Sequence, residues 1–579
     1  MSNNALDKPK KFNLTLNSSG GIALGAFMAG VFFEIIKEAL EENSLAIDII
    51  TGASAGAMTG AIASYYLLQD RNLAKKAFVK PEGNAFYEAW VVEADMENID
   101  SIAVMPIEEW EIIYKGKNRD PFSLLSGKAI ENIADLIKNL PDKVSKISNR
   151  LALLVTVTNL QGILVQNEHS EKDDSKSVTN AEVRKFFFIP DSEKNKQDFK
   201  SKWEKLVDSS RASGAFPIAF PPIKDSSDPK QPDSNFKDIK LSDDYFEGET
   251  LDEKLDIVND NKLEFSYTDG GILDNLPILK GIEIEADSQR KKSDSPQITD
   301  NQKFNQHPSP LPESERHHVY VKPTPVVSLK SLDRLEQTLF TLWEMVLSGL
   351  ILPKQEQEAV QLERIQAIKE KIELKYELIE KFSSNGELKQ KLEREIPYDD
   401  IKLSSITPLI IKKIHQQNCQ ELKPLYDALI KIESPLIEEG LGLKGNDANP
   451  KKLLASDFIR AFGGFFDRQY REHDFVLGRI CGLAWMQESG ICVSQASIEQ
   501  LTIDIQTKIL KKEPIVKISY RVRLTRLFLR FLRIAYLEIK PKKIWILFYY
   551  LFWLPTVLVL RFLESILTLL LWASKSLSL

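Results

Sequence analysis

Short runs of apolar residues, alternating or continuous, recur through the first half of the chain and predict strands. Residues 12–16 alternate apolar and polar side chains, which is typical of a strand with one buried face. Residues 45–50 predict a second strand. Residues 151–158 are almost continuously apolar, as in a strand buried on both faces of a parallel sheet. Two shorter strands are predicted at residues 265–268 and 318–322.

Helical patterns separate the first of these strands. Residues 26–36 form an apolar run that predicts a helix, and a run of small residues predicts another helix that extends through Tyr66. Because strands alternate with helices, the pattern predicts an α/β domain with a mostly parallel sheet.

Three polar and charged stretches interrupt this domain, and we interpret them as insertions. They cover residues 168–182, 223–248 and 286–315. The last one is rich in Ser, Gln, Asp and Pro, a composition that predicts disorder because it offers little apolar surface to bury. With its insertions, the predicted domain spans residues 1–328.

A helical extension is predicted for residues 329–512. Within it, residues 354–395 are dense in Glu, Lys, Leu and Ile at helical spacing, with a break near Asn385 and Gly386. This pattern predicts a long solvated helix or a pair of helices and does not indicate a binding surface.

The last segment, residues 513–579, combines a basic helical face with a long apolar run. Residues 544–560 carry no charge and contain Trp and Tyr, and basic residues precede them. This combination predicts a membrane-associated tail on an anionic surface. A single tilted span, a re-entrant hairpin and an interfacial helix all fit, and a helix buried in a soluble core is the alternative. The arginines that share one helical face are Arg523, Arg526, Arg530 and Arg533.

Composition narrows the class of protein. The 579 residues are 43% hydrophobic and 27% charged, as in a globular protein, and the net charge of −7 argues against a general nucleic-acid binder. Cys419, Cys481 and Cys492 have no zinc-ligand spacing and favour a reducing compartment. Since the N-terminus shows no secretory signal, and the tail is predicted to bind a membrane, we expect the chain at the cytoplasmic side of a membrane. The sequence shows no metal-ligand cluster, and we expect no metal or cofactor.

A candidate nucleophile follows the second predicted strand. Residues Gly52-Ala-Ser-Ala-Gly56 fit the pattern G-x-S-x-G, which places Ser54 on a tight turn from a strand into a helix. The flanking Gly52 and Gly56 avoid crowding the turn, and the helix N-terminus directs amides at developing negative charge. A packed glycine-rich turn without chemistry is the alternative.

A glycine-rich loop after the first strand is a candidate oxyanion hole. In Ser19-Gly-Gly-Ile-Ala-Leu-Gly25, the two adjacent glycines allow backbone amides to converge on an anion. We expect Gly20, Gly21 and Ile22 to supply these amides. Neither the P-loop nor the dinucleotide-binding pattern fits this loop, and a helix start that needs small residues is the other interpretation.

A carboxylate at the end of a later strand is the candidate base. Asp269 precedes Gly270 and Gly271, whose turn can hold the side chain toward a serine. An Asp-Gly-Gly sequence is by itself usually only a turn. Serine hydrolases commonly use histidine instead, and His473, which precedes Asp474, is the histidine that best fits a triad with Ser54.

Together, these motifs resemble the patatin-like phospholipase family. The oxyanion loop, the G-x-S-x-G turn and the Asp-Gly-Gly block occur in that family's order, and residues 211–217, Arg-Ala-Ser-Gly-Ala-Phe-Pro, look like its A-S-x-A-x-P segment. Residues 465–479 resemble a segment of a bacterial patatin-related subgroup, which implies a bacterial source and a structural helix around His473. The resemblance covers roughly residues 12–325.

The resemblance implies a three-layer α/β domain and a lipid acyl hydrolase with a Ser–Asp dyad. Ser54 would attack the ester carbonyl of a membrane lipid, as in a phospholipase A or lysophospholipase, and Asp269 would act as base. One departure concerns the oxyanion loop, where many members carry G-G-G-x-[KR]-G. Here Ser19 takes the first position, no basic residue follows, and the spacing to Gly25 is one residue longer.

Two other functions remain open at this point. The first is a His-dependent esterase or thioesterase that acts on soluble acyl substrates through His473. The second is a membrane-tethered lipid-binding scaffold whose altered oxyanion loop no longer supports turnover.

Overall fold

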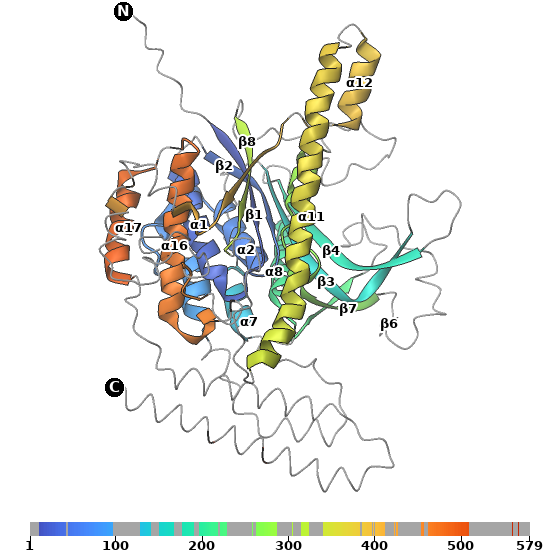
Figure 1. The fold of residues 1–579 in the computed structure, drawn as a ribbon. Helices are drawn as coiled ribbons and strands as arrows, with labels where there is room; N and C mark the ends of the chain where they lie inside the picture. The colour runs from blue at the N-terminus through green and yellow to red at the C-terminus, as the bar shows by residue number, and fades with distance from the viewer. Residues whose placement is uncertain are drawn as a thin grey trace, which may run out of the picture. The chain divides into compact units, whose positions relative to one another are not determined.

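The fold is described from a computed structural model of the chain (Figure 1). Nearly all of the membrane-associated tail predicted at 513–579, and nearly all of the predicted insertion 286–315, lie outside the described residues. Within the described ranges, no helix is long and apolar enough to cross a membrane. These ranges are 11–41, 45–95, 128–139, 150–166, 176–189, 196–217, 220–227, 257–258, 262–286, 314–323, 340–381, 385–396, 400–411, 424–425, 453–456, 463–491 and 493–508, with a few single positions.

The chain divides into two compact units, of which the first contains residues 1–98, 128–216 and 222–510. The described residues of this unit form a nine-stranded mixed sheet in the order β5-β7-β3-β2-β1-β8-β9, with β4 paired to β3 and β6 paired to β7. The strands are β1 (Phe12–Ser18), β2 (Leu45–Gly52), β3 (Leu151–Gln166), β4 (Lys176–Phe188), β5 (Ile223–Ser227), β6 (Ile257–Val258), β7 (Lys262–Asp269), β8 (Glu315–Val321) and β9 (Lys402–Ile406).

The sheet has a parallel part and an antiparallel part. Strands β3, β2, β1, β8 and β9 run parallel, which confirms the expected parallel core of an α/β domain. Strands β4 and β7 pair antiparallel with β3, and strands β5 and β6 pair antiparallel with β7. Two predicted insertions contribute to this part, because β4 begins at Lys176 and β5 begins at Ile223. The sequence did not predict these two strands because the side chains in the insertions are mostly polar, whereas strand pairing depends only on hydrogen bonds between backbone groups.

Helices cover both faces of the sheet, so the predicted three-layer arrangement is confirmed. Side chains of neighbouring strand residues point to opposite faces. Gly60 of α2 packs against Ile50, whereas Gly281 of α9 packs against the adjacent Thr51. Helix α8 lies with α2, where Gly214 meets Met58. The helices are α1 (Gly25–Glu41), α2 (Ala55–Leu67), α3 (Arg71–Ala77), α4 (Ala85–Tyr87), the π-helix η2 (Glu88–Glu93), α7 (Lys128–Asp135), α8 (Lys196–Gly214), α9 (Ile278–Ala286), α11 (Phe340–Lys381), α12 (Gly386–Glu395), α16 (Arg468–Glu488) and α17 (Gln495–Lys508).

Helix α16 crosses α1 at backbone contact distance. A methyl group on Gly30 would lie 2.0 Å from the carbonyl oxygen of Phe475, and one on Gly478 would lie 2.0 Å from the carbonyl oxygen of Phe27. Beside this crossing, the buried Arg479 donates to Glu34 of α1 at 2.6 Å. Residues 468–479 of the segment 465–479 therefore belong to a helix that packs on α1, as the resemblance implies for the region around His473 (Figure 1).

The helical extension contains the long helix that its spacing predicts. Helix α11 runs through residues 340–381, and α12 begins after Asn385, whose side chain accepts a hydrogen bond from the amide of Leu388. One face of α11 is buried, because Ile365 and Ile372 pack with Leu276 after the Asp-Gly-Gly block. The extension also supplies β9, a strand that helical periodicity did not predict.

A buried charge cluster lies in the parallel part of the sheet. The register between β1 and β2 shifts at Asp48, which is an extra residue between the pairs Leu14–Ile47 and Thr15–Ile49. The Asp48 carboxylate contacts the guanidinium groups of Arg150 and Arg316. Burial alone would raise the pKa of Asp48, but the two arginines outweigh it and lower that pKa.

Candidate active site

Ser54 lies on a strained turn between β2 and α2. Its backbone has φ 54° and ψ −127°, a combination that L-residues other than glycine rarely adopt. Two close approaches explain the flanking glycines. A methyl group on Gly52 would lie 2.6 Å from the backbone of Gly56, and one on Gly56 would lie 2.5 Å from the carbonyl oxygen of Ser18. The structure thus has the strand–turn–helix geometry that the G-x-S-x-G pattern predicts.

Strand β3 brings Asp269 next to the turn that carries Ser54. Strand β4 occupies one edge of β3 through residues 151–158, so β2 and β7 must share the other edge. On that edge, Gly52 of β2 pairs with Val155, and Asp269 of β7 pairs with Val157. Two residues along a strand span about 7 Å. Asp269 therefore lies just beyond the end of β2, where the chain turns into Ser54.

The end of α8 contacts the backbone of both candidate catalytic segments. The Ser213 hydroxyl accepts a hydrogen bond from the amide of Ser54 at 2.7 Å. Two residues later, the carbonyl oxygen of Ala215 accepts the amide of Asp269 at 2.9 Å. These residues belong to the 211–217 block that resembles the family's A-S-x-A-x-P segment, and here that block joins the serine turn to the aspartate strand.

The turn after Asp269 orients its carboxylate. One carboxylate oxygen accepts the amide of Gly271 at 2.7 Å, and the residue is fully buried. A methyl group on Gly270 would lie 1.9 Å from the carbonyl oxygen of Thr156, so only glycine fits at this position. Gly270 therefore allows the close approach of β3, and the amide of Gly271 holds the carboxylate.

The glycine-rich loop lies against the serine. A methyl group on Gly20 would lie 2.9 Å from Ser54 Cβ and 3.6 Å from Ser54 Oγ. The amide of Gly20 donates to Asn275, at 3.1 Å to the side-chain oxygen and 3.3 Å to the carbonyl oxygen. Asn275 follows the Asp269 block, so the loop, the serine turn and the aspartate block meet at one place. No motif in the sequence gives Asn275 a role of its own.

The unusual spacing of the loop has a structural explanation. Residues 22–24 form a single 3-10 turn, and Ile22 adopts a positive φ of 52°. This turn lies in the stretch before Gly25 whose spacing is one residue longer than in the family pattern. A methyl group on Gly25 would lie 2.3 Å from the ring of Trp90, so packing requires glycine there.

His473 lies in α16 and is fully buried. Its Nδ1 lies 3.1 Å from a carboxylate oxygen of Asp474, and the Asp474 carboxylate accepts the backbone amides of Ala455 and Ser456. These contacts fix a loop onto α16, and none of them involves Ser54 or Asp269. They favour a structural role for the His473–Asp474 pair.

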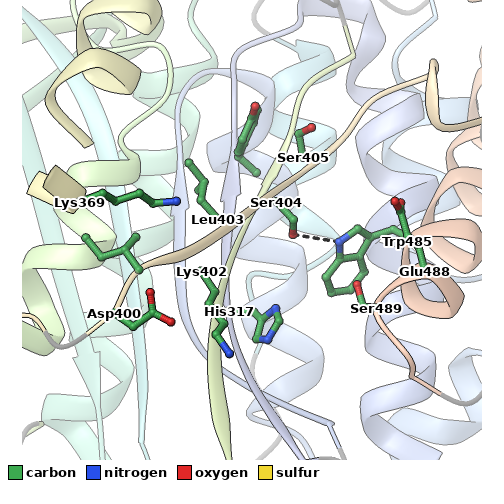
Figure 2. Close-up of a pocket in the computed structure, with 12 residues that line it drawn as sticks. His317, Lys369, Asp400, Lys402, Leu403, Ser404, Ser405, Trp485, Glu488 and Ser489 are labelled. Carbon is green, nitrogen blue, oxygen red and sulfur yellow. Dashed lines mark hydrogen bonds between the residues drawn. The ribbon is translucent and has the colours of Figure 1, made fainter. Parts of the chain in front are cut away.

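A pocket of about 690 Å³ opens elsewhere, along β8 and β9 (Figure 2). His317, Lys402, Ser404 and Trp485 are among its lining residues, and the Trp485 indole donates to the Ser404 hydroxyl at 3.0 Å. Its lining contains none of the predicted catalytic or oxyanion residues, so this pocket is separate from the serine site.

Comparison with known proteins finds a family model that matches a segment in the first half of the chain. The model of the family described as "Patatin-like phospholipase" matches residues 17–281. No curated protein sequence matches the chain. Among solved structures, the crystal structure of VipD from Legionella pneumophila is similar at 13% identity, over 88% of this chain and 93% of that chain. Its TM-score of 0.20 is too low for the match to bear on fold or function.

Proposed function

We propose that this chain is a serine lipid acyl hydrolase with a Ser–Asp dyad, since the model of the patatin-like phospholipase family matches residues 17–281. The observation that carries the proposal is the shared edge of β3, which places Asp269 just beyond the strand that leads into Ser54. The strained serine turn supports the same role, because such a turn projects the hydroxyl into open space.

In the proposed reaction, Ser54 Oγ attacks the carbonyl carbon of a carboxylic ester, and the Asp269 carboxylate accepts the hydroxyl proton. The tetrahedral intermediate collapses, the alcohol leaves with that proton, and the acyl group remains on Ser54. Water then attacks the acyl-enzyme and transfers a proton to Asp269. When the acid leaves, this proton returns to Ser54 Oγ.

The oxyanion donors follow from the hydrogen bonds of the loop. The amide of Gly20 donates to Asn275, so we assign Gly20 the role of holding the loop close to Ser54. None of the hydrogen bonds in the described part of the chain uses the amides of Gly21 and Ile22. We assign the oxyanion to these two amides. Each such donor accounts for on the order of 100-fold in rate.

The proposed substrates are carboxylic esters of membrane lipids, as for a phospholipase A or lysophospholipase. Two sequence features support this substrate class and a site of action at the cytoplasmic face of a membrane. The basic face at 523–533 suits an anionic surface, and the apolar run at 544–560 suits the lipid itself.

Covalent labelling tests the proposal directly. A fluorophosphonate probe should label the full-length chain, and Ser54→Ala should abolish labelling as well as the release of fatty acid from mixed vesicles. Asp269→Asn should abolish turnover while the protein stays folded. Hydrolysis that persists in the Ser54→Ala variant would rule out the mechanism, and a wild-type chain without labelling would indicate an inactive scaffold.

A further inference from the structure

A buried ion pair lies outside the region that matches the family model. Lys322 directly follows β8, and Glu358 lies on α11; their exposed fractions are 7% and 4%, and their side chains form a salt bridge. A buried pair of this kind is weak evidence for stability, because its desolvation cost offsets much of its attraction. Stability alone therefore does not explain why Lys322 and Glu358 form a buried pair at this position.

Hydrogen bonds connect this pair to the oxyanion loop. The second carboxylate oxygen of Glu358 accepts the Asn275 side-chain amide at 2.6 Å. A carboxylate can only accept, so it must face the NH₂ group of Asn275. The carbonyl oxygen of the same side chain then faces Gly20, whose amide it accepts at 3.1 Å. The contact with Glu358 thus fixes which way the Asn275 side chain points, and Asn275 in turn holds the amide of Gly20.

Two neighbouring residues show that α11 clamps the whole segment after Asp269. Gln357 donates to the carbonyl oxygen of Ile272 at 3.3 Å, and Gln361 donates to the carboxylate of Asp274 at 2.5 Å. Positions three and four residues apart share a helix face, so Gln361 continues the surface formed by Gln357 and Glu358.

The strand end that carries Lys322 holds the loop from the other side. The carbonyl oxygen of Val321 accepts the amide of Ser19 at 3.2 Å. Pro323 lies close enough to Gly21 that a methyl group there would be 3.0 Å from its ring. The loop is therefore held between the end of β8 and the segment that α11 clamps.

We propose that Glu358 is a positioning residue for the oxyanion loop, held in place by its salt bridge to Lys322, so that the helical extension forms part of the active site. This inference rests on the proposed function of that site. Oxyanion donors stabilise the transition state when they are held in place beforehand. Loss of the Glu358 contact should therefore lower kcat and leave KM nearly unchanged.

An apolar double replacement separates positioning from stability. Glu358→Leu alone would leave Lys322 buried without a partner, whereas Lys322→Met combined with Glu358→Leu removes both charges and should restore the melting temperature. We expect the double variant to lose at least about 10-fold in kcat, with KM within about twofold of wild type. Asn275→Ala should lower kcat by a similar factor. Adding Asn275→Ala to the double variant should lower kcat little further, since all three changes break the same hydrogen-bonded connection from Glu358 through Asn275 to Gly20.

The matched control is Lys375→Met. Lys375 is also a buried lysine of α11, but it donates to the carbonyl oxygens of Ile396 and Tyr398, about 25 Å along the helix from Glu358. Its replacement should lower the melting temperature without changing kcat.

Wild-type kcat in the folded double variant would overturn the positioning role. A wild-type chain that neither hydrolyses esters nor reacts with a fluorophosphonate would instead contradict the proposed function, so the two failures can be told apart.

Discussion

The backbone amide of Gly20 and the side-chain oxygen of Asn275 lie 3.1 Å apart, although 255 residues separate them in the sequence. This hydrogen bond joins the loop after the first strand to the block that begins with Asp269. The same glycine touches Ser54. A methyl group on Gly20 would collide with both Asn275 and Ser54, and this makes Gly20 a sensitive probe of the site.

Gly20→Ala should reduce ester hydrolysis by about 100-fold or more, because misplacing the loop removes transition-state stabilisation. The new methyl group would lie 2.5 Å from the Asn275 side-chain oxygen and 2.9 Å from Ser54 Cβ. Steady-state kinetics on a soluble ester measures the effect. Gly386→Ala is the control, since nothing lies within 4 Å of that position. Full activity in Gly20→Ala would mean that the loop is not part of the site.

His473→Ala should leave ester hydrolysis within about twofold of wild type and lower stability by about 1–3 kcal/mol, because it removes a fully buried ring that pairs with Asp474. Kinetics and urea unfolding measure the two effects separately. A loss of rate of 1,000-fold or so in a folded variant would instead favour the His-dependent esterase.

Asp274 should make the protein less stable as the pH rises. Burial raises the pKa of its carboxyl group to about 6, against an ordinary value of 3.8, and the hydrogen bond from Gln361 only partly offsets this. Between these two pH values the unfolded chain has lost the proton that the folded chain keeps, so the stability falls across this window and stays low above it. Asp274→Asn should remove this slope and stabilise the protein by about 1–2 kcal/mol at pH 7. Urea midpoints at pH 4 and pH 7 test it, and an unchanged slope would contradict it.

Asp48→Ala should destabilise the protein by about 3–5 kcal/mol at pH 7, because the buried Arg150 and Arg316 would then share only the partly exposed carboxylate of Glu285. The lowered pKa of Asp48 has the opposite linkage to that of Asp274. Its stabilisation is present above the ordinary carboxyl pKa and is lost as the pH falls through the lower, folded value. Unfolding curves from pH 7 down to pH 3 should therefore converge for wild type and variant. Parallel curves would exclude this linkage.

The sequence pattern was enough to predict those parts of the structure that depend on a single short segment of the chain. The turn at Ser54 follows from an apolar strand, two glycines and a run of small residues, all within about fifteen positions. The break at Asn385 was equally predictable, because a side chain that caps a helix acts on the next turn.

Contacts between distant segments were not predictable in this way. Glu358 occurs in a run of charged residues whose composition indicates a solvated helix, and only the fold shows that it faces Asn275. Strand β9 was missed because its residues, Lys-Leu-Ser-Ser-Ile, are mostly polar and pair with β8 through the backbone. The register shift at Asp48 was not predictable either, because the partners of Asp48, Arg150 and Arg316, lie far away in the sequence.

The glycine-to-glycine crossing of α1 and α16 bears on how the enzyme can be produced. A recombinant piece that stops at residue 281, where the family match ends, would lack α16 and β8. It would expose the surface around Gly30 to water and leave β1 with an open edge, both of which invite aggregation. The shortest well-behaved fragment should therefore extend through α17 to about residue 508, far beyond the catalytic motifs.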